Sequence, residues 1–151
     1  MVAVVGRPRQ GGIADAIADY EQRAARYWPV AVHEVREESA RSRTPEAVMD
    51  AEAERLLARV PSGARLVACD PGGETMDSPA FARFLSAERD AATDVAFVIG
   101  GAHGLGDAVR RRAVRRLSLA PWTLPHELAR LVLAEQLYRA GTIVRGEPYH
   151  K

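Results

Sequence analysis

Apolar residues follow two alternating patterns along this chain. In the first, short uninterrupted apolar segments end at Gly or Asp, such as "VAVVG" (2–6) and "ARLVACD" (64–70), which is typical of strands buried on both faces. In the second, apolar residues recur every three or four positions, as in "IADAIADYEQRAARYW" (13–28), which indicates an amphipathic helix. The two patterns take turns through the chain, so the sequence predicts strands that alternate with helices.

Five strands and five helices are expected in this alternation. The strands are expected at residues 2–6, 30–37, 64–70, 93–101 and 117–120. The helices are expected at residues 13–28, 45–60, 78–90, 107–116 and 125–141. Thr44 is expected to start the second helix, and residues 71–78 to form a loop. Such an alternation is typical of a mostly parallel sheet with helices on both faces, so we expect one α/β domain over residues 1–151.

Three of the expected strands end in segments rich in Gly or Pro. These are "CDPGG" (69–73), "IGGAHG" (99–104) and "LAPWTLP" (119–125). Parallel α/β sheets bind ligands beyond the carboxyl ends of their strands, so these segments are candidate binding sites. The glycine segment is neither the dinucleotide fingerprint nor a P-loop, since no Gly-Lys-Ser/Thr occurs in the chain. By itself it favours a tight turn, with a backbone-lined ligand cradle as the alternative.

Composition removes several function classes. Hydrophobic residues make up 47% of the chain, so a sizeable core is possible, but no apolar run approaches the roughly 18 residues of a membrane span. The chain start lacks the pattern of a secretory signal, and we expect a cytoplasmic protein without membrane contact. The net charge of +1 gives no case for DNA or any other nucleic acid by charge alone. The cluster "RRRAVRR" (110–116) is either a solvated helix face or a phosphate-binding patch.

Metal and thiol chemistry find little support in the sequence. Cys69 is the only cysteine, which excludes an internal disulfide, and a lone cysteine on an apolar strand is more often core than nucleophile. Asp70 after it is expected to cap its own loop. The four histidines lack the spacing of metal ligands, and no Gly-x-Ser-x-Gly motif occurs. We therefore expect no metal cofactor and no serine hydrolase.

The last expected helix is apolar on nearly every side over residues 128–138. A helix of this kind is buried on both sides, and a single sheet covers only one of them. A second copy of the chain across a two-fold axis would cover the other side, and the chain's own loops are the alternative. Few residues remain for that covering, which favours a homodimer.

Three segments resemble the RlmH family. They are "FVIGGAHGLG" (97–106), "LSLAPWTLPHELARLVLAEQLYRA" (117–140) and "RGEPYHK" (145–151). The resemblance extends over the length and element order of the whole chain. Members of the RlmH family are small SPOUT-class methyltransferases that act as homodimers on N3 of a pseudouridine in a hairpin of 23S ribosomal RNA. The resemblance thus implies a C-terminal trefoil knot, S-adenosylmethionine as methyl donor, and the assembled ribosome as partner.

The resemblance also implies which residues hold the cofactor, and they fall in the three candidate segments. They are Cys69, Gly101, Leu119, Ala120, Pro121, Trp122, Thr123 and Leu124. Relatives usually carry an aliphatic residue where this chain has Cys69, so its backbone rather than its thiol is expected to face the cofactor. Because the methyl group is already activated, the protein has mainly to align donor and acceptor and to lose the N3 proton.

Candidate catalytic or positioning groups lie on the last helix and the chain end. They are His126, Arg130, Glu135, Tyr138, Arg139, Tyr149, His150 and Lys151. His126 and His150 titrate in the useful range, but the sequence does not choose between them. The chain end is expected to reach the partner's cofactor. Two alternatives stay open: a SPOUT methyltransferase of another RNA such as tRNA, and a non-catalytic RNA-binding factor in ribosome assembly. A flavodoxin-like nucleotide-binding module is disfavoured because its phosphate loops are missing.

Overall fold

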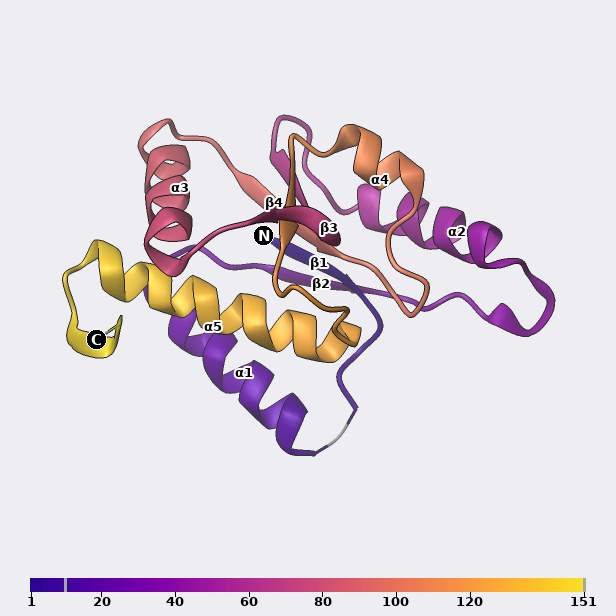
Figure 1. Ribbon diagram of the computed structural model, residues 1–151, viewed down its shortest axis with the longest axis horizontal. Helices are drawn as coiled ribbons and strands as arrows, with labels where there is room; N and C mark the ends of the chain where they lie inside the picture. The colour runs from indigo at the N-terminus through magenta and orange to yellow at the C-terminus, as the bar shows by residue number, and fades with distance from the viewer. Residues whose placement is uncertain (10, 151) are drawn as a thin grey trace.

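A five-stranded parallel sheet forms the centre of the computed structural model, which describes residues 1–9 and 11–150 (Figure 1). The strands are β1 (Val2–Val5), β2 (Val32–Val35), β3 (Arg65–Thr75), β4 (Val95–Ile99) and β5 (Arg115–Ser118). The helices are α1 (Gly12–Ala24), α2 (Pro45–Leu57), α3 (Ser78–Asp90), α4 (Asp107–Arg112) and α5 (His126–Val144). Two 3-10 turns lie at Ala40–Ser42 and Pro148–His150. The strand order is β2-β1-β4-β3-β5, and the predicted alternation is confirmed.

The sheet separates two hydrophobic layers, as predicted. One layer packs α1, α3 and α5 on residues such as Val2, Val4 and Phe97, and the other packs α2 and α4 on Ala3 and Val5. Successive residues of a strand point to opposite faces, so the uninterrupted apolar segments supply both layers at once. Figure 1 shows α2 beside α4 on one face and α5 between α1 and α3 on the other.

The third strand is longer than predicted. Residues 71–78 were expected to form a loop, but β3 continues to Thr75 and pairs with β5 across a bulge between Cys69 and Glu74. A Cβ at Gly73 would lie 2.5 Å from the carbonyl carbon of Arg116, so this pairing requires glycine. Glycine that predicts a turn in the sequence here permits the close approach of two strands.

The fourth helix is shorter than predicted. It ends at Arg112, and Arg115 and Arg116 belong to β5. Arginine favours helices, and this propensity hid an edge strand whose long charged side chains are partly exposed. The expectation that residues 110–116 form one helix face is therefore wrong, because only residues 110–112 of this cluster are helical.

One side of the last helix is buried against α1, α3 and the sheet. Leu133 is only 1% exposed, and the Trp28 indole N–H after α1 donates to the Leu137 carbonyl at 2.8 Å. A Cβ at Gly141 would lie 2.3 Å from Cγ of Tyr27, so α1 and α5 approach closely at this glycine. Leu128, Leu131 and Val132, on the other side of the helix, are only partly buried, so the single chain accounts for only part of the apolar pattern. The homodimer and the trefoil knot stay predictions that rest on the family resemblance.

Candidate functional site

A cavity of about 760 Å³ lies at the carboxyl ends of β4 and β5 and beside residues 69–71 of β3, where the pairing of β3 with β4 ends. Its size is typical of a small-molecule site. Its walls include the predicted cofactor residues Cys69, Gly101, Leu119, Ala120, Trp122, Thr123 and Leu124. Pro121, the remaining predicted residue, is exposed and is not among the residues that line the cavity. The three marked strand ends therefore meet at one site, although binding of a cofactor there stays a prediction.

The glycine segment is both a tight turn and a wall of the cavity. The Gly104 amide donates to the Gly101 carbonyl at 3.0 Å, and Gly104 has a φ of +88°. A Cβ at Gly100 would lie 2.4 Å from the Gly104 carbonyl oxygen. A Cβ at Gly101 would lie 2.7 Å from Oε2 of Glu52, on α2. Glycine at position 101 is therefore required by the packing of α2 behind the loop.

Asp70 organises the polar side of the cavity. Its Oδ1 accepts the Gly72 amide at 2.9 Å, which confirms the predicted loop cap, and its Oδ2 accepts Nε of Arg110 at 2.8 Å. Nη2 of Arg116 lies 3.4 Å from the same oxygen. Burial raises the pKa of Asp70, but Arg110, the Gly72 amide and Arg116 together lower it by more, so the pKa falls below its ordinary value. Asp70 thus stays ionised and holds Arg110 at the cavity wall.

The Cys69 thiol is not a nucleophile at neutral pH. Burial raises its pKa to about 12, so the reactive thiolate is scarce. This agrees with the expectation that Cys69 serves through its backbone.

His126 is the one candidate catalytic residue with a described side chain that lines this cavity. Its Nε2 lies 3.7 Å from Oε1 of Glu37. Gly6, at the end of β1, leaves room for both groups, because a Cβ there would lie 2.5 Å from the Glu37 carboxylate and 3.1 Å from His126 Nε2. The geometry therefore places one titratable base beside the cavity.

Arg130 points away from the cavity into a buried ion-pair cluster. Its Nε donates to Glu21 on α1 at 2.7 Å, and its Nη1 donates to Glu34 on β2 at 2.8 Å. Burial lowers the pKa of the Arg130 guanidinium, but the two carboxylates together raise it by more, so the pKa lies above its ordinary value. Arg130 thus joins three elements of the fold and has no access to its own cavity.

The chain end packs against its own last helix. The Tyr149 hydroxyl donates to Oε1 of Glu135 at 3.1 Å, its ring lies 4.5 Å from that of Tyr138, and the guanidinium of Arg139 lies over it at 4.8 Å. Glu135 is nine residues beyond His126, about 14 Å along the helix axis. This cluster is separate from the cavity of its own chain. The side chain of His150 and all of Lys151 lie outside the described residues.

Residues 1–150 match the family described as predicted SPOUT methyltransferases. The chain belongs to the SPOUT methyltransferase family. A relative from Gemmatimonas aurantiaca, named ribosomal RNA large subunit methyltransferase H, is 69% identical over 98% of this chain and 96% of its own length. A protein of the same name from Pelobacter propionicus is 46% identical over 97% and 95%. The crystal structure of the A. aeolicus TrmH/SpoU tRNA modifying enzyme has the same fold, with a TM-score of 0.50 at 14% identity over 97% of this chain and 76% of that one.

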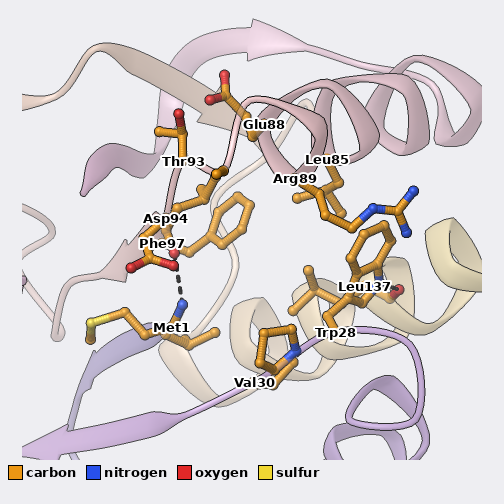
Figure 2. A pocket seen from close by; sticks show the side chains of 14 residues that line it. Met1, Trp28, Val30, Leu85, Glu88, Arg89, Thr93, Asp94, Phe97 and Leu137 are labelled. Carbon is orange, nitrogen blue, oxygen red and sulfur yellow. Dashed lines mark hydrogen bonds between the residues drawn. The ribbon is translucent and has the colours of Figure 1, made fainter. Parts of the chain in front are cut away.

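A second cavity of this SPOUT chain, of about 270 Å³, lies at the amino ends of β1 and β4. Figure 2 shows its mostly apolar wall, which includes Trp28, Leu85, Phe97 and Leu137. Its polar groups are largely engaged, since the Met1 nitrogen donates to the Val95 carbonyl at 2.7 Å and Glu88 pairs with Arg65 at 3.0 Å. We therefore assign the function to the larger cavity.

None of the helices within residues 1–9 and 11–150 has the length and apolar character needed to cross a membrane. The same residues form no group of three or more His, Cys, Asp or Glu side chains that could hold a metal ion.

Proposed function

We propose that this chain transfers a methyl group from S-adenosylmethionine to N3 of a pseudouridine in a hairpin of 23S ribosomal RNA. The observation that carries the proposal is the convergence of three strand ends on one cavity of about 760 Å³. Methyltransferases of the SPOUT class use this donor. The relatives' names add large-subunit ribosomal RNA as the substrate class. A ribosomal substrate in turn implies work in the cytoplasm.

In this reaction the chain's own residues hold the donor in position and accept the N3 proton. The donor supplies an activated methyl group when it is bound. The main chain of the glycine loop and of residues 119–124 holds the donor in place, which leaves alignment as the principal source of rate. The methyl group moves to N3, its former bonding electrons stay on sulfur, and the N3 proton leaves to a base. We assign that base to His126, because it lines the cavity and its Nε2 lies 3.7 Å from a carboxylate oxygen of Glu37.

A catalytic role of the chain end requires a second subunit. Tyr149 packs on Glu135 and Arg139, away from the cavity of its own chain. We propose that a homodimer brings this cluster to the partner's cavity, where an aromatic ring can stack on an unpaired base. Deletion of Tyr149–Lys151 is expected to leave cofactor binding intact and to abolish methylation.

Mixed dimers test this assignment. One subunit lacks Tyr149–Lys151, and the other carries Gly101→Val, which displaces the glycine loop against Glu52. If the chain end acts on the partner's cavity, the single intact cavity is served and about half of the wild-type activity survives. An inactive mixed dimer would show that the chain end serves its own subunit.

Contacts with RNA are proposed to come from local arginines. Arg111 and Arg112 are exposed beside the cavity wall formed by Arg110, and the net charge of +1 gives no strong attraction at long range. The substrate is therefore expected to be a structured ribosomal particle. Equal turnover on free hairpin RNA and on ribosomes would contradict this expectation.

Mass spectrometry of ribosomal RNA from a deletion strain tests the whole proposal. The expected result is loss of one methyl group from a pseudouridine of 23S RNA, restored by the wild-type gene. Loss of a methyl group from tRNA would instead support the alternative RNA substrate. Unmodified RNA profiles, together with absence of S-adenosylmethionine binding in calorimetry, would support a non-catalytic RNA-binding factor.

A further inference from the structure

A buried carboxylate lies directly behind the glycine loop. Glu52 on α2 is 3% exposed, and its Oε1 accepts one hydrogen bond, from the Glu38 amide at 3.0 Å. Its Oε2 has no hydrogen-bond partner among the described residues. Buried carboxylates ordinarily have a cation or several donors, because burial without partners is costly. The unpartnered oxygen of Glu52 therefore points to a role in ligand binding.

Only the backbone of Gly101 separates Glu52 from the cavity. Gly101 lines the cavity, and its vacant Cβ position lies 2.7 Å from Oε2 and 3.1 Å from Oε1 of Glu52. A ligand in contact with the other side of Gly101 would lie about 4 Å from it, which puts the carboxylate about 8 Å from the ligand.

Among the described residues, the arginines near Glu52 pair with other carboxylates. Arg55 and Arg43 both pair with Glu38, and Arg110 pairs with Asp70. The second buried carboxylate of the cavity, Asp70, is matched by two arginines. Glu52 is thus the buried carboxylate beside the cavity that has no arginine partner among the described residues.

We propose that Glu52 makes the cavity prefer a cationic sulfonium donor over its neutral thioether product. This inference rests on the proposed function. When the methyl group leaves, the electron pair of the broken bond stays on sulfur and the positive charge of the sulfonium is lost. A fixed negative charge behind the loop attracts the donor but not the product, so the spent cofactor is exchanged for a fresh one.

The expected size follows from Coulomb's law. For a sulfonium held against Gly101, two unit charges about 8 Å apart in a medium of effective dielectric constant about 30 change a binding constant by about tenfold. The whole effect falls on the donor, since the product has no charge at sulfur.

Calorimetry of the full-length protein with S-adenosylmethionine and with S-adenosylhomocysteine measures this preference. The quantity is the ratio of the two dissociation constants, product over donor. Glu52→Gln removes the charge at nearly constant shape and is expected to lower the ratio by about tenfold. Glu54→Gln is the matched control, because it is the same change two residues away on the exposed side of α2, and its ratio should equal that of the wild type.

Two more variants separate charge from packing. Glu52→Asp keeps the charge and should keep the ratio within about threefold of the wild type, even if both affinities fall. Glu52→Met is neutral and of similar size, so it should repeat the effect of Glu52→Gln if that variant does not fold. Equal loss of both affinities in the neutral variants, with the ratio unchanged, would overturn the inference while leaving the proposed function standing. A wild-type protein that binds neither ligand would overturn both.

Discussion

Replacing Arg130 with Met is expected to destabilise the fold rather than only the reaction. The Arg130 side chain is 7% exposed, and its guanidinium donates to Glu21 and Glu34 at 2.7 and 2.8 Å. Methionine fills a similar volume, so the main loss is the cation between two carboxylates. Removal of one partner from a buried ion pair costs more than the pair contributes, because a partly buried charge is left uncompensated.

The magnitude follows from the burial of the three side chains. Breaking a buried pair costs about 3–5 kcal/mol. Glu21 and Glu34 keep 21% and 28% of their side chains exposed, so water solvates part of the released charge. We therefore expect a loss of about 3 kcal/mol in the free energy of unfolding, which corresponds to a fall of about 6–12 °C in Tm for a domain of this length. The free energy of unfolding of Arg130→Lys should lie between those of the wild type and Arg130→Met, since one ammonium does not replace a guanidinium that donates to two carboxylates.

Urea unfolding at one fixed protein concentration measures this loss, because association would otherwise shift the midpoint. Arg7→Met is the control: Arg7 also pairs with Glu34, at 3.2 Å, but its side chain is 87% exposed, and the expected change is within about 0.5 kcal/mol. A loss below about 1 kcal/mol for Arg130→Met, together with a large fall in methylation, would refute the structural role. It would return Arg130 to the catalytic residues.

Three further outcomes are expected. Gly101→Ala should weaken binding of S-adenosylmethionine by about tenfold in calorimetry, since the loop must move away from Glu52, whereas Gly12→Ala, which has open space at its Cβ position, should have no effect. Asp70 has a lowered pKa in the folded state, so the stability that it contributes is complete above its ordinary value near 4 and is lost as the pH falls through the lowered value. The difference in unfolding free energy between wild type and Asp70→Asn should shrink across that acid range, and a constant difference would contradict the assignment. Leu133→Glu should unfold the single chain, seen as loss of the helical circular dichroism signal, and a folded monomer in sedimentation would instead return this residue to a subunit interface.

Local signals in the sequence account for most of the secondary structure. Thr44 accepts the Ala47 amide and starts α2 as predicted, and the predicted local cap of Asp70 forms with the Gly72 amide, although Gly72 lies in β3 and not in a loop. Both contacts join residues two or three positions apart. The strand residues that the sequence did not predict are 71–75 and 115–116, where a strand forms only because β3 and β5 pair with each other. Neither segment carries a strand pattern of its own.

The sequence by itself determined the alternation of strands and helices and the three strand ends that meet at the cavity. Periodicity and strand-ending residues are local properties, and parallel pairing then brings those ends to one edge of the sheet. The tertiary structure alone decided that Arg130 is held by Glu21 and Glu34, that Tyr149 lies on α5, and that Glu52 stands behind Gly101. The hydrogen bonds join residues that are 14 to 109 positions apart in the sequence, and Glu52 and Gly101 are 49 positions apart (101 − 52). The partner of a charged side chain is set by which elements pack together, and no local pattern in the chain encodes that choice.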